Sequence, residues 1–155
     1  MEKPTNNLFI SWKFLFGFLF FCFFGLTAKG QNFDLSLTVA GIDQSAGGKI
    51  KLGVFNSHET FKTKSNPLFE ATLAANDTIE KYTFKEIPSG LYAIALFHDE
   101  NGDNTLNTKK LGIPSEGVGF SGEYKGKIKP PNFKDASFQL TIDTTIFTRI
   151  HYTKK

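Results

Sequence analysis

Oxygen-bearing side chains occupy every second position of one loop, which follows an apolar segment at 91–97. Calcium binds about six to eight oxygen ligands, and a tight loop supplies them from alternate side chains and a backbone carbonyl. A glutamate in the Gly/Pro-rich turn that follows could fold back to add a carboxylate. We therefore expect a candidate calcium site made by six residues: Asp99, Asn101, Asp103, Thr105, Asn107 and Glu116.

The loop departs from the EF-hand pattern at two positions. Asn104 stands where a glycine is usual, and Lys110 stands where a bidentate glutamate is expected. The alternative is a polar turn whose Asp and Asn side chains accept hydrogen bonds from their own backbone. Without an ion, such a turn would hold the charges of Asp99 and Asp103 close together.

His98, Asp99 and Glu116 are the residues that could perform acid–base chemistry, and a small hydrolase-like enzyme using them is the alternative function. Adjacent residues of a strand point to opposite faces, so His98 and Asp99 cannot orient one another directly. The sequence contains no nucleophile elbow, phosphate loop or dinucleotide fingerprint. We therefore expect no catalytic residues, and we favour a non-catalytic binding or structural module.

Aromatic side chains recur in the Gly/Pro-rich segment 112–133. Phe120, Tyr124 and Phe133, together with His98, could form a recognition patch beside the acidic loop. The alternative, which we favour, is that these aromatic side chains anchor a long loop to the domain.

Several motifs of this region resemble those of a known family. They are His98-Asp99-Glu100-Asn101-Gly102, then 111–117 (LGIPSEG), then Gly119-Phe120-Ser121, with Pro130, Pro131, Phe133, Ala136 and Phe138 further on. They are similar to the HDxNxN loop, GxPxE turn and GFS tripeptide of small secreted bacterial proteins of unknown function. Asp103-Asn104 departs from the usual Asn-Gly of that loop. The resemblance implies a secreted β-sandwich and no known chemistry.

The first 30 residues have the pattern of a signal peptide. Lys3 and Lys13 precede an apolar run at 14–26, and Ala28 and Gly30 follow it. The run is shorter than the ~20 apolar residues that cross a bilayer. We predict cleavage after Gly30, one secreted or periplasmic domain at 31–155, and no stable membrane span after cleavage. A retained N-terminal anchor is the alternative.

Composition limits the partners of this domain. The formal charge of +3 includes three lysines and one glutamate of residues 1–30, and the basic residues that remain are scattered. We therefore expect no nucleic acid partner, and instead an unknown ligand or a component of the cell envelope. The single cysteine, Cys22, lies in the leader, so the domain contains no disulfide.

The hydrophobic pattern predicts the fold class. Apolar and polar residues alternate at 33–39 and 49–54, while 91–97 is apolar at nearly every position, as in a central strand covered on both faces. Weaker strands follow from the patterns at 69–73, 79–84, 136–142 and 146–152, and 57–61 suits a short helical turn with Phe61 inward. About seven short strands predict an all-β, antiparallel Greek-key sandwich of immunoglobulin or transthyretin type. Tyr92 after Gly90 suits a tyrosine corner, with a plain core aromatic as the alternative.

Overall fold

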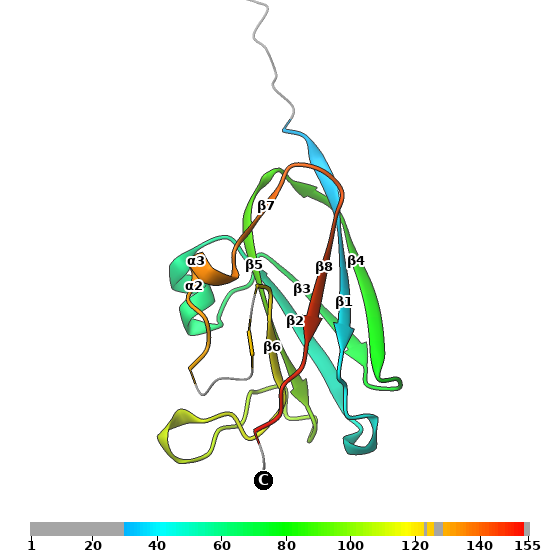
Figure 1. Ribbon diagram of the computed structural model, residues 1–155, viewed down its shortest axis with the longest axis vertical. Coiled ribbons are helices and arrows are strands. Elements are labelled where there is room, and N and C mark those ends of the chain that lie inside the picture. The colour runs from blue at the N-terminus through cyan, green and yellow to red at the C-terminus, as the bar shows by residue number, and fades with distance from the viewer. Residues whose placement is uncertain (1–29, 123, 126–128, 154–155) are drawn as a thin grey trace, which may run out of the picture.

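The computed structural model describes residues 30–122, 124–125 and 129–153 (Figure 1). The predicted signal peptide therefore lies almost wholly outside the described residues, and its prediction stands untested. Among the helices of the described ranges, none is long and apolar enough to cross a membrane.

Two sheets pack face to face, so the predicted all-β sandwich is confirmed (Figure 1). The first sheet has the order β4-β1-β8, and the second has the order β3-β2-β5-β6, with β7 paired to the other end of β5. The strands are β1 (Asn32–Ala40), β2 (Lys49–Phe55), β3 (Phe69–Ala74), β4 (Ile79–Pro88), β5 (Gly90–Asp99), β6 (Val118–Phe120), β7 (Phe138–Leu140) and β8 (Thr144–Arg149). The helical segments are η1 (Gln44–Ala46), α2 (His58–Thr63), η2 (Lys110–Gly112) and α3 (Phe133–Ala136).

The sandwich is not wholly antiparallel, because β1 and β8 run parallel from Leu35↔Thr144 to Ala40↔Arg149. The short connection 141–143 carries the chain from β7 in one sheet to β8 in the other. Its Asp143 carboxylate accepts the Asp34 N–H at 2.9 Å and so fixes the start of this pairing. Alternation predicts a half-buried strand but does not state the direction of its neighbour, so the parallel pair could not be foreseen.

The alternating residues of β1 face the core between the sheets. Leu35, Leu37 and Val39 are buried there against alternate residues of β2 and β5. The other face of β5 packs against a second cluster formed mainly by Phe55, Phe61, Val118, Phe120 and Ala136. The central strand is thus covered on both faces, as its unbroken apolar run predicts.

Two smaller predictions are also confirmed. The Tyr92 hydroxyl donates to the Pro88 carbonyl at 2.9 Å, which is the bond expected of a tyrosine corner. The turn at 57–61 belongs to α2, where Ser57 accepts the Thr60 N–H and Phe61 is buried. By contrast, the strand predicted at 136–142 is shorter, because α3 ends at Ala136 before β7 begins.

Candidate functional site

His98 is a buried structural residue and does not belong to a recognition patch. It has no solvent exposure, and its Nε2–H donates to the Gly47 carbonyl at 2.5 Å. The Tyr152 hydroxyl accepts the Asp43 N–H at 2.9 Å and donates to His98 Nδ1 at 2.7 Å. A carbonyl only accepts, so Nε2 carries a proton, and in the neutral ring Nδ1 is then the acceptor. The prediction that placed His98 in the patch is therefore wrong, because this chain of bonds consumes both ring nitrogens.

The Asp99 carboxylate closes the turn that follows it. One oxygen accepts the Gly102 N–H at 2.8 Å, and the other accepts the Asn104 N–H at 3.0 Å. Gly102 and Asn104 both have positive φ angles, of 77° and 63°. Asn tolerates this conformation better than most residues, which explains how position 104 can do without glycine.

Asp103 is the centre of a second set of hydrogen bonds. Its Oδ2 accepts both side-chain amides of Asn101 and Asn107 at 3.0 Å, and its Oδ1 accepts the Thr105 N–H and hydroxyl at 2.8 Å. The pKa of Asp103 is held far below its usual value, first by the Asn107 amide and then by the Thr105 and Asn101 donors. The carboxylates of Asp99 and Asp103 thus each have hydrogen-bond donors within the loop, and these donors offset the two charges that the turn holds close together.

Glu116 does fold back to the loop, as the sequence analysis expected. Its two carboxylate oxygens accept the Glu100 N–H at 3.1 Å and the Asn107 N–H at 2.9 Å. The side chain is 5% exposed and joins the two ends of the 99–107 loop. At the next residue, a Cβ on Gly117 would lie 2.4 Å from the Tyr152 ring, so this turn needs glycine.

These bonds decide what the six residues do in the structure. Asp99, Asn101, Asp103, Thr105, Asn107 and Glu116 form one loop whose carboxylates accept hydrogen bonds from protein donors. Over the part of the chain that the structure describes, no three His, Cys, Asp or Glu side chains lie together as a metal-binding group. His98, Asp99 and Glu116 bond to different partners, so the structure does not assemble the acid–base group of the alternative hydrolase.

Ser121 has a structural role that the sequence analysis missed. Ser121 is 1% exposed, and its Oγ accepts the Ile94 N–H at 2.8 Å and donates to the Ala136 carbonyl at 2.7 Å. This one hydroxyl joins β5 to the end of α3. A serine directly after an apolar pair in a Gly-rich segment was the only available signal, and it does not distinguish a buried bridge from an exposed turn.

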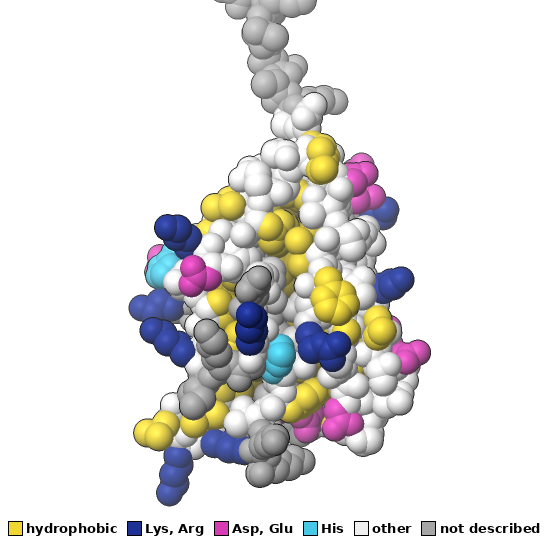
Figure 2. All heavy atoms as spheres, viewed as in Figure 1, with side chains coloured by type: hydrophobic (Ala, Val, Ile, Leu, Met, Phe, Trp, Pro, Cys, Tyr) yellow, Lys and Arg dark blue, Asp and Glu magenta, His cyan; other side chains and the backbone are white. Residues whose placement is uncertain are grey.

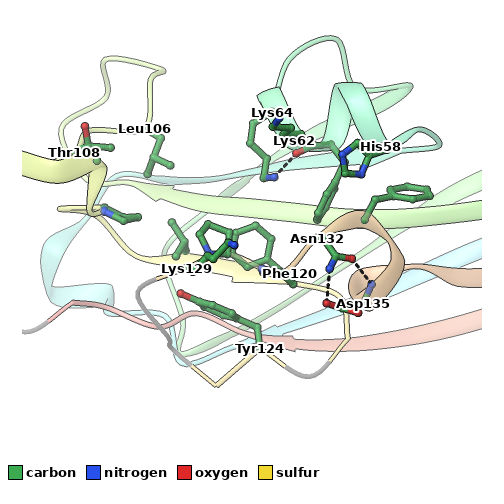
Figure 3. A pocket seen from close by; sticks show the side chains of 17 residues that line it. His58, Lys62, Lys64, Leu106, Thr108, Phe120, Tyr124, Lys129, Asn132 and Asp135 are labelled. Atoms are coloured by element: carbon green, nitrogen blue, oxygen red, sulfur yellow. Dashed lines mark hydrogen bonds between the residues drawn. The ribbon is translucent and has the colours of Figure 1, made fainter.

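A cavity of about 870 Å³ lies beside α2 and α3, on the face of the second sheet away from the core between the sheets. We call it the α2–α3 cavity. Its walls combine aromatic rings with lysines, and the residues that matter below are Phe61, Lys64, Phe120, Tyr124, Lys129 and Phe133. Figure 3 shows Lys64 entering from the α2 side, with Phe120, Tyr124 and Lys129 on the facing wall. The structure thus brings together the three aromatic residues of the expected patch and replaces His98 by lysines.

The aromatic side chains anchor their segment, as the favoured alternative expects, while a recognition role for them stays a prediction. Phe120 is buried, and Tyr124 and Phe133 are half-buried against the second apolar cluster. Ring centroids are 6.1 Å apart for Phe61 and Phe120, 5.9 Å for Phe61 and Phe133, and 4.9 Å for Phe120 and Tyr124. These edge-to-face contacts fix the rings without filling the cavity above them.

Residues 37–147 match the DUF2141 family, which is described as uncharacterized proteins conserved in bacteria. The chain belongs to this family. The comparison with curated proteins and the comparison with solved structures gave no match. The DUF2141 match includes the 99–107 loop and every residue that lines the α2–α3 cavity. An unknown-function family with a β-sandwich fold is consistent with a non-catalytic module.

Proposed function

We propose that this DUF2141 protein is an exported, non-catalytic binding module and that the α2–α3 cavity is its ligand site. The observation on which this rests is a contrast between two groups of residues. The polar residues best suited to chemistry are consumed by structural hydrogen bonds at His98, Asp99 and Glu116. The α2–α3 cavity, in contrast, is lined by cationic side chains and by Tyr124 and Phe133, whose half-buried rings keep part of their surface open.

The cavity has the properties of a small-molecule site. Such sites are concave, mostly apolar, and about 300–1,000 Å³ in volume, with a few polar groups that orient the ligand. The α2–α3 cavity falls in this range at about 870 Å³. Its rings are held by one another, so the ligand site is formed before binding.

Export is supported by the leader pattern of residues 1–30. It would place the domain in the periplasm or outside the cell, where an envelope component or a free small molecule could be its ligand.

Calcium binding by the 99–107 loop remains a prediction of this proposal. Asn101 and Asn107 both reach Asp103 with their side-chain amides, and a flip of each amide would present its oxygen instead. A cation could then take the place of these two donors. Glu116 and Asp99 would keep their backbone bonds and hold the loop in shape.

The binding site is tested with phenylnaphthylamine, a neutral aromatic dye that fluoresces in apolar surroundings. We expect saturable binding that weakens about tenfold in Phe133→Ala, because burying an aromatic side chain contributes about 1.5–3 kcal/mol and Phe133, already half-buried, gives the lower end of that range. Leu106→Ala removes a more exposed part of the cavity wall and serves as a second variant with little effect on folding. The control is Phe147→Ala, because Phe147 is 59% exposed on the other sheet. Absence of saturable binding, or equal binding by all four proteins, contradicts the proposed site.

A further inference from the structure

The walls of the α2–α3 cavity carry more positive than negative side chains. Lys62, Lys64 and Lys129 line it against one carboxylate, Asp135. The Asp135 carboxylate already accepts the Asn132 side-chain amide at 2.7 Å, and its backbone N–H donates to Asn132. Figure 2 shows several dark-blue side chains on the side where α2 lies in Figure 1, with acidic side chains among them. The cavity therefore attracts anions.

Lys64 is the cation set deepest among the aromatic rings. Its ammonium donates to the Phe61 carbonyl and lies 3.8 Å from the centroid of the Phe61 ring and 5.4 Å from that of Phe120. Burial lowers the pKa of Lys64 from 10.5 to about 8. Across the described ranges, the recorded ion pair joins Lys85 to Asp34, on the first sheet. An ammonium has three donors, and the Phe61 carbonyl takes one of them.

The left-handed conformation of Lys64 brings this ammonium over the rings. Lys64 ends α2 with a φ of 55°, and its N–H bonds to the Thr60 carbonyl. The backbone thereby turns back toward the sheet, and the side chain extends over Phe61. Aromatic faces stabilise a partly desolvated ammonium by cation–π attraction, but they do so less than an anion that accepts a charge-assisted hydrogen bond from it.

We propose that the α2–α3 cavity binds a small amphipathic acid, with its apolar body on the aromatic rings and its anionic group on Lys64. This inference rests on the proposed function, since it assigns a ligand class to the same cavity. Tyr124 and Phe133, which are half-buried, offer ring surface to the apolar body, and the buried rings of Phe61 and Phe120 pack against them. Lys129, at the opposite wall, lies where it can contact the acid from the other side.

A pair of matched dyes tests the ligand class. Anilinonaphthalene sulfonate has the aromatic rings of phenylnaphthylamine and adds one sulfonate. We expect the wild-type protein to bind the sulfonate dye about tenfold more tightly than the neutral dye, the factor that one charge-assisted hydrogen bond supplies. Lys64→Gln should abolish this preference, and Lys64→Arg should keep it. Lys81→Gln is the control, because it removes the same charge from an exposed position on β4.

Each result separates the two claims. If both dyes bind equally, Lys64→Gln changes neither and Phe133→Ala weakens both, the cavity is a ligand site but the acid class is wrong. If Lys81→Gln reduces sulfonate binding as much as Lys64→Gln does, the preference comes from net charge, and the role of Lys64 is wrong. If neither dye binds, the proposed function itself fails. Any dye held by the apolar run 14–26 is common to all variants, so the role of Lys64 is read from the difference between Lys64→Gln and Lys81→Gln.

Discussion

Replacing Ser121 by alanine removes the hydroxyl that joins β5 to α3. Ile94 would lose the acceptor of its N–H, and Ala136 would lose the donor to its carbonyl. Ile94 has no solvent exposure and Ala136 is 1% exposed, so water does not reach either group without a local rearrangement. A buried donor without a partner costs about 1–3 kcal/mol, and the second lost bond adds about 1 kcal/mol. We therefore expect Ser121→Ala to lower the free energy of unfolding by about 2–4 kcal/mol.

The loss is large relative to the total stability of a domain, about 5–15 kcal/mol. At about 4 °C for each kcal/mol, the melting temperature should fall by roughly 8–16 °C. Circular dichroism during heating measures this fall, and urea unfolding gives the free energy. Ser89→Ala is the matched control, because Ser89 is exposed in the turn before β5 and should change stability by less than about 0.5 kcal/mol. If the two variants melt together, Ser121 is not the structural bridge described above.

Three further predictions concern Lys64, the acidic loop and the leader. The pKa of Lys64 is about 8 in the folded protein and 10.5 ordinarily, so the folded state releases this proton first, and stability should rise with pH between these values. The full pKa shift would raise the free energy of unfolding by about 3 kcal/mol, and the partial exposure of Lys64 reduces this gain to about 1 kcal/mol. The gain should appear as a rise of the urea midpoint with pH in the wild type and should be missing in Lys64→Gln. The other ionisable side chains that line the cavity are the same in the wild type and in Lys64→Gln: His58, Lys62, Lys129 and Asp135. The difference between the two pH profiles therefore reports on Lys64, and parallel profiles would contradict the lowered pKa of Lys64. Calcium at millimolar concentration should raise the melting temperature of the wild type and not that of Asp103→Asn, whereas equal responses would exclude a calcium site in the 99–107 loop. The exported protein should have the mass of residues 31–155 and no tryptophan emission, since Trp12 is the single tryptophan; emission from protein recovered after export would refute cleavage after Gly30.

The sequence predicts the sandwich because burial on one face imposes alternation on a strand. The apolar residues of β1 and β2 show it, and the unbroken run of β5 predicts its two covered faces. The tyrosine corner is predictable for a similar reason, since Tyr92 follows a tight turn at a fixed offset. The parallel pairing of β8 with β1 depends on how the short connection 141–143 crosses between the sheets. The alternation of apolar and polar residues does not predict the path of a connection.

The candidate site shows a different limit. Alternating Asp and Asn side chains suit a cation and suit the backbone N–H groups of a turn equally, because both take the same oxygens. Only the geometry shows that the carboxylates of Asp99 and Glu116 accept N–H donors. The α2–α3 cavity was foreseeable in part, through the aromatic residues of segment 112–133. Lys64 was not, because its approach to Phe120 depends on the way α2 packs against β6.

The most direct test of the account is to locate the bound sulfonate dye by nuclear magnetic resonance. Amide signals of the isotope-labelled protein are followed while anilinonaphthalene sulfonate is added. The account predicts shifts concentrated in α2, α3 and the segment around Phe120, with little change in the loop around Asp99 or in β1, β4 and β8. Shifts centred on residues 99–104, which do not line the cavity, or spread evenly over both sheets, would contradict the α2–α3 cavity as the ligand site.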